Sequence, residues 1–165
     1  MSRGQNWSTP CRRFSLHITA ESWRQINSEC GRADYIETGG VLVGHYSADG
    51  FMVFVTDALS PPKDSAQGKN WFHRGIAGLQ TLFTKRWYDR VRSYYVGEWH
   101  YHPADSVEPS ATDIAQMLSI NADPRYCCLE PVLIIAGRSD IDGDRPCRAF
   151  VFPRGHEYLE FTARN

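Results

Sequence analysis

The chain has 165 residues, of which 42% are hydrophobic and 22% charged, a composition that predicts a globular domain with a core of its own. Its 18 lysines and arginines are balanced by 19 acidic residues, so there is no basic excess to indicate nucleic acid as a ligand. No apolar run approaches the ~20 residues of a membrane-spanning helix, and an odd number of cysteines without CxxC spacing or a secretory signal predicts a cytoplasmic protein with reduced thiols.

The hydrophobic pattern predicts elements in the order β-α-β-β-α-β-α-β-β-β. Strands are indicated by alternation or by short apolar runs between turn-forming residues, and helices by apolar residues three or four positions apart. In chain order these elements are a strand at 13–18, a helix from Thr19 to Gly31, strands at 36–46 and 51–59, a helix at 75–92, a strand at 94–102, a helix at 110–121, and strands at 131–136, 149–152 and 158–161. The polar segments 60–74 and 123–130 are rich in turn-forming residues, so we expect loops there.

Two of the predicted helices carry an apolar face that we expect to pack on the sheet. These faces consist of Ile76, Leu79, Phe83 and Trp87 in the helix 75–92, and of Ile114, Met117 and Leu118 in the helix 110–121. The order of elements predicts the α/β or α+β class, with helices flanking a mixed, curved β-sheet. We expect one domain over residues 1–165, with its core at about 13–161.

The segment GEWHYHPADSVEPSATD, residues 97–113, has the pattern of a metal site. His100 and His102 are two positions apart on a predicted strand and so point to the same face. Asp113 falls in the first turn of the next helix, where side chains lean back toward the helix start and the strand end. Two imidazoles and a carboxylate with a fourth position left open are the ligand set of a catalytic zinc ion. A metal ion there lowers the pKa of a water molecule to near ~7, so hydrolysis is the natural chemistry.

Ser110 has a possible role beside the same metal ion. If it caps the helix, its hydroxyl can donate a hydrogen bond to the oxyanion of a tetrahedral intermediate. Taken alone, Ser-x-x-Asp is a common capping box, and His-x-His on a strand is often only a pair of half-exposed histidines. A capping box does not explain His100 and His102, and a histidine pair does not explain the spacing to Asp113. The combined pattern therefore predicts a metal site.

Metal-assisted hydrolysis needs a general base, and two glutamates compete for that role. Glu98 shares a strand face with the two histidines, so geometry favours it as the base or as an additional ligand. Its simpler role is to orient a histidine. Glu37 lies just before the GGVLVG strand, and its simpler role is that of a solvated loop carboxylate.

The sequence ETGGVLVG, from Glu37 to Gly44, followed by H-x-H-x7-S-x2-D over residues 100–113, resembles the JAB/MPN domain with its JAMM metalloprotease motif. The resemblance covers about Phe14 to Val151. It implies a mixed sheet flanked by helices and a zinc ion held by His100, His102 and Asp113. It also implies that Glu37, rather than Glu98, is the general base, and that Ser110 supports the tetrahedral intermediate.

Active members of this family cleave peptide or isopeptide bonds after the C-terminus of ubiquitin or a ubiquitin-like protein. Glu98 departs from the eukaryotic pattern, and GEWHYHP is similar to bacterial stand-alone JAB proteases encoded beside E1- and E2-like enzymes, some in antiphage defence operons. The resemblance therefore implies a zinc isopeptidase or precursor-processing peptidase for a ubiquitin-like protein, with E1- and E2-like enzymes as possible partners.

Substrate contacts are expected in segments 60–74 and 121–130, where the family carries substrate-binding insertions. Trp71, Phe72 and His73 are the candidates, and the alternative is a loop folded back on the core. Two other functions remain open. One is a non-catalytic scaffold, although scaffolds of this family typically lose a ligand. The other is an iron enzyme, because two histidines and a carboxylate also bind iron(II).

Overall fold

The computed structural model describes residues 4–163 except residues 105 and 142. In chain order the elements are β1 (Gln5–Ser8), β2 (Ser15–Ile18), α1 (Ala20–Ala33), β3 (Thr38–Tyr46), β4 (Met52–Ala58), β5 (Ala66–Gly68), β6 (Trp71–His73), α2 (Leu79–Tyr88), β7 (Tyr94–His102), α3 (Ala111–Ala122), the 3-10 turn η1 (Pro124–Tyr126), β8 (Val132–Gly137), β9 (Cys147–Val151) and β10 (Leu159–Ala163). Among the described helices, none has the length and apolar character needed to cross a membrane.

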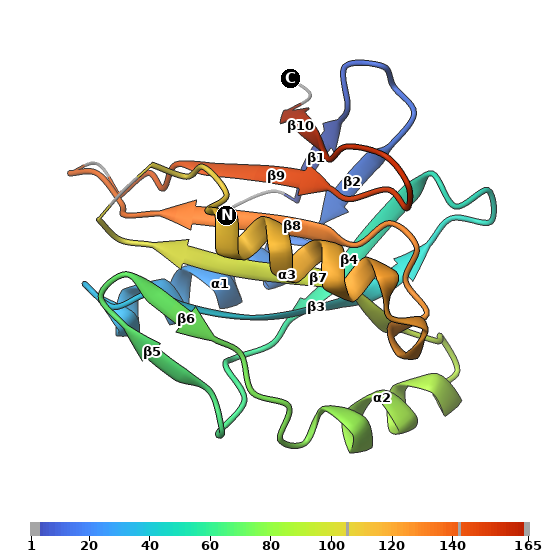
Figure 1. Cartoon of the computed structure of the whole chain (residues 1–165), viewed down its shortest axis with the longest axis horizontal. Coiled ribbons are helices and arrows are strands. Elements are labelled where there is room, and N and C mark those ends of the chain that lie inside the picture. Colours follow the sequence, from blue (N-terminus) through green and yellow to red (C-terminus); the bar gives the residue numbers. More distant parts are fainter. Residues whose placement is uncertain (1–3, 105, 142, 164–165) are drawn as a thin grey trace.

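The main sheet closes into a barrel with the strand order β1-β10-β9-β8-β7-β3-β4-β2 (Figure 1). It is mixed, because β2 pairs with β4 and β7 with β8 in parallel while the other neighbours are antiparallel. The predicted mixed sheet with helices is therefore confirmed. The closure was not predicted, because it depends on β1, a short polar segment whose Trp7 is buried between β2 and β10.

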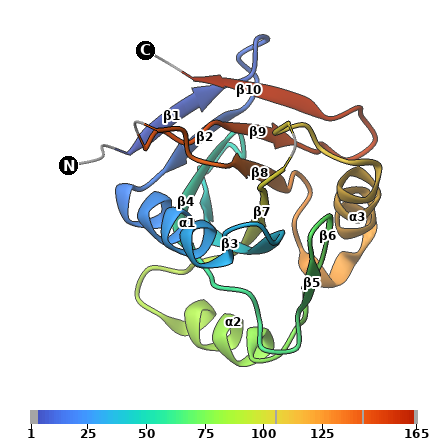
Figure 2. The same cartoon turned by 90° about the vertical axis from the view of Figure 1, so that its left-hand side faces the viewer.

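The three α-helices lie around the barrel, with α1 and α3 on opposite sides and α2 below them in Figure 2. Thr19 caps α1 as predicted, because its side chain accepts a hydrogen bond from the amide of Ser22. The helix passes Gly31, where we expected it to end, and stops at Ala33 before Asp34, whose φ is 53°. Trp23, Ile26 and Cys30 fill the barrel side of α1.

A β-bulge sets the direction in which the motif residues point. In the pairing of β3 with β7, Leu42 lies opposite Gly97 and Val43 opposite Tyr95, so β7 carries an extra residue there. Because side chains alternate along a strand, one extra residue exchanges the two faces. Beyond the bulge, Trp99 and Tyr101 therefore join the barrel core, while Glu98, His100 and His102 lie on the other face of β7. That face is also where α3 packs, with Met117 buried.

Two expectations about the connecting segments were wrong. Segment 60–74 is not irregular, because β5 and β6 form an antiparallel hairpin within it. The helix predicted at 75–92 is only Leu79–Tyr88, since Gly78 adopts a φ of 81° just before it. Only part of its expected apolar face is buried. Leu79 and Phe83 pack on the core, whereas Ile76 is 70% and Trp87 47% exposed. In α3, Leu118 likewise points outward and is 48% exposed.

Candidate metal centre

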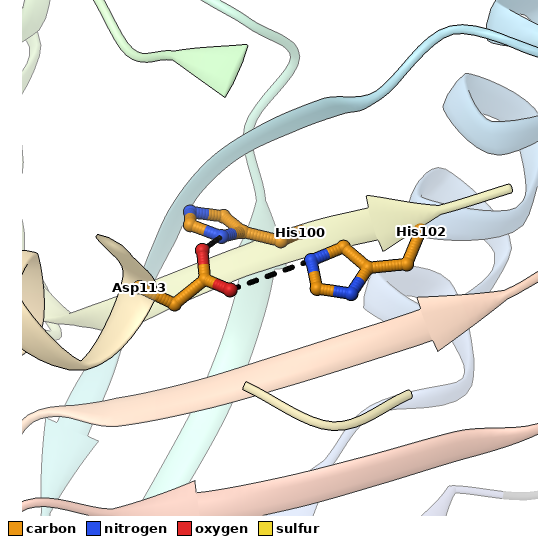
Figure 3. Close-up of side chains that lie close together, drawn as sticks. All are labelled: His100, His102 and Asp113. Atoms are coloured by element: carbon orange, nitrogen blue, oxygen red, sulfur yellow. Dashed lines mark hydrogen bonds and ion pairs between the residues drawn. The ribbon is translucent and has the colours of Figure 1, made fainter. Parts of the chain in front are cut away.

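The end of β7 and the start of α3 bring two histidines and an aspartate together (Figure 3). His100 Nδ1 lies 2.7 Å from Asp113 Oδ1, and His102 Nε2 lies 3.5 Å from Asp113 Oδ2. One ligand atom from each of the three residues can be chosen so that all lie within 4.8 Å of one another. The side chains are nearly buried, with exposures of 3%, 8% and 7% for His100, His102 and Asp113. The structure therefore brings the three predicted ligands to one point.

The capping box at Ser110 holds Asp113 in place. The amide and the hydroxyl of Ser110 both donate to Asp113 Oδ2 at 2.7 Å, and the amide of Asp113 donates to Ser110 Oγ at 3.1 Å. The common structural explanation of Ser-x-x-Asp is thus correct here. It does not compete with the metal site, because the cap fixes the carboxylate that faces the two histidines.

Charge within the cluster shifts the pKa values of its members. Burial opposes a charge on His100, but the carboxylates of Asp113 and Glu98 outweigh it and raise the pKa of His100 from 6.5 to about 9. The pKa of His102 is also raised, against the effect of burial, by Asp113 and by the charge of Glu37. For Asp113, the histidines overcome the effect of burial and lower the pKa well below its ordinary value. The cluster thus attracts positive charge.

These residues fit a bound zinc ion. Within the described part of the chain, His100 Nε2 is buried and has no hydrogen-bond partner. A buried ring nitrogen without a partner costs free energy, and binding a metal ion or sharing a proton with a carboxylate would remove that cost. Two imidazoles and one carboxylate are also the donor set that catalytic zinc sites use.

Glu98 shares the face of the histidines, as predicted, and is fully buried. Its Oε1 accepts a hydrogen bond from Arg74 Nε at 2.8 Å, and its Oε2 accepts one from Gln116 Nε2 at 3.0 Å. Its distance to His100 Nε2 is 3.7 Å, too long for a hydrogen bond. Arg74 could not be predicted from the sequence, because an arginine at the end of a polar segment carries no signal that its partner is a buried glutamate 24 residues later.

Glu37 lies beside the cluster, at the residue directly before β3. The antiparallel register of β3 with β7 ends at the pair of Thr38 with Tyr101, so the chain enters β3 from Glu37 next to the end of β7 that carries His102. The effect of the Glu37 charge on the pKa of His102 agrees with this position.

The β5–β6 hairpin forms a wall of the same site. The ring of Phe72 meets the ring of His100 edge-on, with centroids 5.8 Å apart. Trp71 and His73, the other predicted contacts, point away and are exposed, Trp71 by 53%. The hairpin is therefore neither a free loop nor fully folded back on the core.

Comparison with known proteins shows to which family the chain belongs. The family model described as prokaryotic homologs of the JAB domain matches residues 19–151. The chain belongs to this family. The chain is 44% identical over 142 residues to a protein of Enterobacter hormaechei subsp. hoffmannii, and the match covers 86% of this chain and 77% of the relative. It is 29% identical over 143 residues to a protein of Pseudomonas aeruginosa, and that match covers 81% of this chain and 84% of the relative. Both relatives bear the name CD-NTase/cGAS isopeptidase.

Its fold is also similar to a solved structure. The solution structure of protein DSY2949 from Desulfitobacterium hafniense covers 90% of this chain and 88% of that chain, with a TM-score of 0.57 at 17% sequence identity. At that identity the likeness concerns the fold alone. The resemblance to the bacterial JAB branch, first suggested by the motif, is confirmed by the family match.

Proposed function

We propose that this protein is a zinc-dependent isopeptidase, with His100, His102 and Asp113 as the metal ligands and Glu37 as the general base. The convergence of His100, His102 and Asp113 at one buried point, with the charge of Glu37 near enough to act on His102, supports the proposal. The names of the two relatives support the reaction class. In this proposal residues 1–165 form a single JAB/MPN-like domain whose core spans about 13–161, and the protein works in the cytoplasm.

Zinc, when bound, supplies Lewis-acid polarisation and makes water acidic enough to serve as a nucleophile near neutral pH. Glu37 would accept the proton of the attacking water and deliver it to the departing lysine amine. Ser110 would donate a hydrogen bond from its hydroxyl to the developing oxyanion. This requires the hydroxyl to turn away from Asp113, and the helix cap survives that rotation because the amide of Ser110 keeps its own hydrogen bond to Asp113.

The substrate would be a protein with a glycine-terminated tail, as for a ubiquitin-like protein. In the described chain β6 pairs only with β5, and an extended tail could add to this hairpin through main-chain hydrogen bonds. Exposed Trp71 and His73 would contact the bound partner, while Phe72 would limit the space beside the scissile bond. The names of the relatives suggest that a CD-NTase is one component of the conjugate. E1- and E2-like enzymes of a defence system would assemble the conjugate.

The test is cleavage by Glu37→Gln. Two substrates carry the same Gly-Gly tail, one joined to a reporter by a linear peptide bond and the other to a lysine by an isopeptide bond. The variant should retain one zinc ion per chain and lose cleavage, because the amide cannot accept the proton. The matched control is Glu21→Gln, an exposed glutamate that pairs with Arg24 on α1, and it should cleave like the unaltered protein.

Other outcomes would replace the proposal. If Glu98→Gln lost cleavage with zinc retained while Glu37→Gln stayed active, the base would be Glu98. Bound zinc without cleavage of any conjugate would indicate a scaffold. Bound iron with 2-oxoglutarate turnover would indicate an oxygenase.

A further inference from the structure

The β5–β6 hairpin touches the candidate centre at three separate points. The carbonyl of Gly68 accepts a hydrogen bond from the amide of Glu37 at 2.9 Å. The ring of Phe72 lies against His100. Directly after β6, Arg74 pairs with Glu98 at 2.8 Å. Each point is on a residue of the proposed site or next to one, so the position of the hairpin bears on the site itself.

Arg74 makes the only charged contact among the three. Its side chain is 5% exposed, and that of its partner Glu98 is 0% exposed. Its remaining donors bind the hydroxyl of Tyr126 at 2.8 Å and the carbonyl of Gly75 at 2.9 Å. Because Glu98 also accepts from Gln116 on α3, one buried cluster connects the hairpin to β7, α3 and η1.

Segment 60–77, which includes the β5–β6 hairpin and is called the insertion here, is hydrogen-bonded mainly within itself. Asp64 accepts hydrogen bonds from the amides of Ile76 and Ala77, at 3.0 and 2.8 Å, and Ser65 accepts one from the amide of Gly75 at 2.9 Å. These bonds join the two ends of the insertion, but they do not attach it to the barrel. A closed, self-bonded insertion can tilt as a unit unless a contact outside it fixes its orientation.

We propose that Arg74 is a positioning residue, which fixes the β5–β6 hairpin over the candidate centre through Glu98 and so places Glu37 and Phe72. This inference rests on the proposed function of the centre. The reason is geometric: the planar guanidinium of Arg74 is buried and bonded to Glu98 on β7 and to Tyr126 on η1, so it restricts the orientation of the hairpin against both. A hairpin held in this way is a preformed wall for the substrate tail rather than a mobile lid.

The test uses two variants and one control. Arg74→Met removes the arginine but leaves Glu98 as a buried unpaired charge, which can unfold the protein. Combining Arg74→Met with Glu98→Gln removes both charges and keeps a polar partner for Gln116. The control is Arg86→Met, because Arg86 pairs with Asp57 in a half-buried ion pair outside the insertion.

The first readout is hydrogen exchange, which needs neither zinc nor substrate. In the double variant the amides of Glu37 and Gly75 should exchange at least about tenfold faster than in the unaltered protein, while α1 stays unchanged. The second readout is kcat/KM on tailed conjugates, which should fall at least about tenfold with zinc still bound. Arg74→Lys should recover only part of this loss, because lysine keeps the charge but not the planar fork.

The inference is overturned if the double variant protects the amide of Glu37 as the unaltered protein does and cleaves within twofold of its rate. It is also overturned if zinc is lost while exchange at Glu37 is unchanged, since Arg74 would then act on the metal centre and not on the hairpin. If the unaltered protein cleaves nothing, the proposed function fails while the exchange result still decides whether Arg74 positions the hairpin.

Discussion

Replacing Gly39 by alanine should disturb the candidate centre through steric overlap alone. Gly39 lies opposite His100, and an added Cβ would be 2.5 Å from the carbonyl oxygen of Trp99, 2.8 Å from Phe72 Cε1 and 2.9 Å from His100 Cδ2. The contact with Trp99 is to backbone, so moving the two rings cannot relieve it. Overpacking of this kind costs about 1–3 kcal/mol. With a shift of about 2–4 °C per kcal/mol for a chain of this size, Tm should fall by roughly 2–12 °C.

The matched control is Gly31→Ala in the last turn of α1. Nothing lies within 4 Å of the Cβ added there, so this variant should be more stable by about 0.5–1 kcal/mol. Urea unfolding should show a lower free energy of unfolding for Gly39→Ala and a higher one for Gly31→Ala than for the unaltered protein. Competition with a chromophoric chelator should show zinc affinity at least about tenfold weaker for Gly39→Ala, because His100 is displaced. Unchanged stability and unchanged zinc affinity in Gly39→Ala would refute the packing described for this site.

Three further outcomes follow from the same site and from the thiols. Zinc affinity should rise with pH up to about 9, by about tenfold per pH unit for each proton displaced. The reason is the raised pKa of His100, because below that pH zinc must displace a proton from the imidazole. Calorimetry from pH 6 to 9 checks this, and an affinity that does not change with pH would contradict it. Asp113→Asn should lower zinc affinity by more than about 100-fold and weaken the cap of α3, as measured by chelator competition and urea unfolding. Exposed Cys11, whose pKa is lowered by the Thr9 hydroxyl, should react with iodoacetamide at pH 8 in the folded protein, and mass spectrometry should find three other thiols labelled only after unfolding. These three thiols have pKa values raised by burial to about 12, 11 and 12 at Cys30, Cys128 and Cys147 respectively.

The sequence predicted that His100, His102 and Asp113 lie close together, because their spacing is local. His100 and His102 need only a strand, and Asp113 needs only a capped helix start, and both are short-range patterns. The position of Glu37 could not be derived in this way, because it depends on the register between β3 and β7, which are far apart in the chain. Its role came from the family resemblance and stays a prediction.

The missed elements have physical reasons. β5 and β6 have three residues each, too few to show alternation, and they are held by contacts with the site rather than by their own propensity. The helix at 75–92 was predicted too long because Ile76 continues the helical period of Leu79 and Phe83. The amide of Ile76 is instead bound by Asp64, twelve residues earlier. A polar side chain that binds backbone amides can override a hydrophobic period, and the period gives no sign of it.

The most direct test is anomalous diffraction at the zinc absorption edge from crystals of the purified protein. One peak should lie between the side chains of His100, His102 and Asp113, at about 2.0–2.2 Å from a donor atom of each. The proposal of a zinc centre would be contradicted if no peak appeared there after soaking in excess zinc, or if the peak lay on other residues.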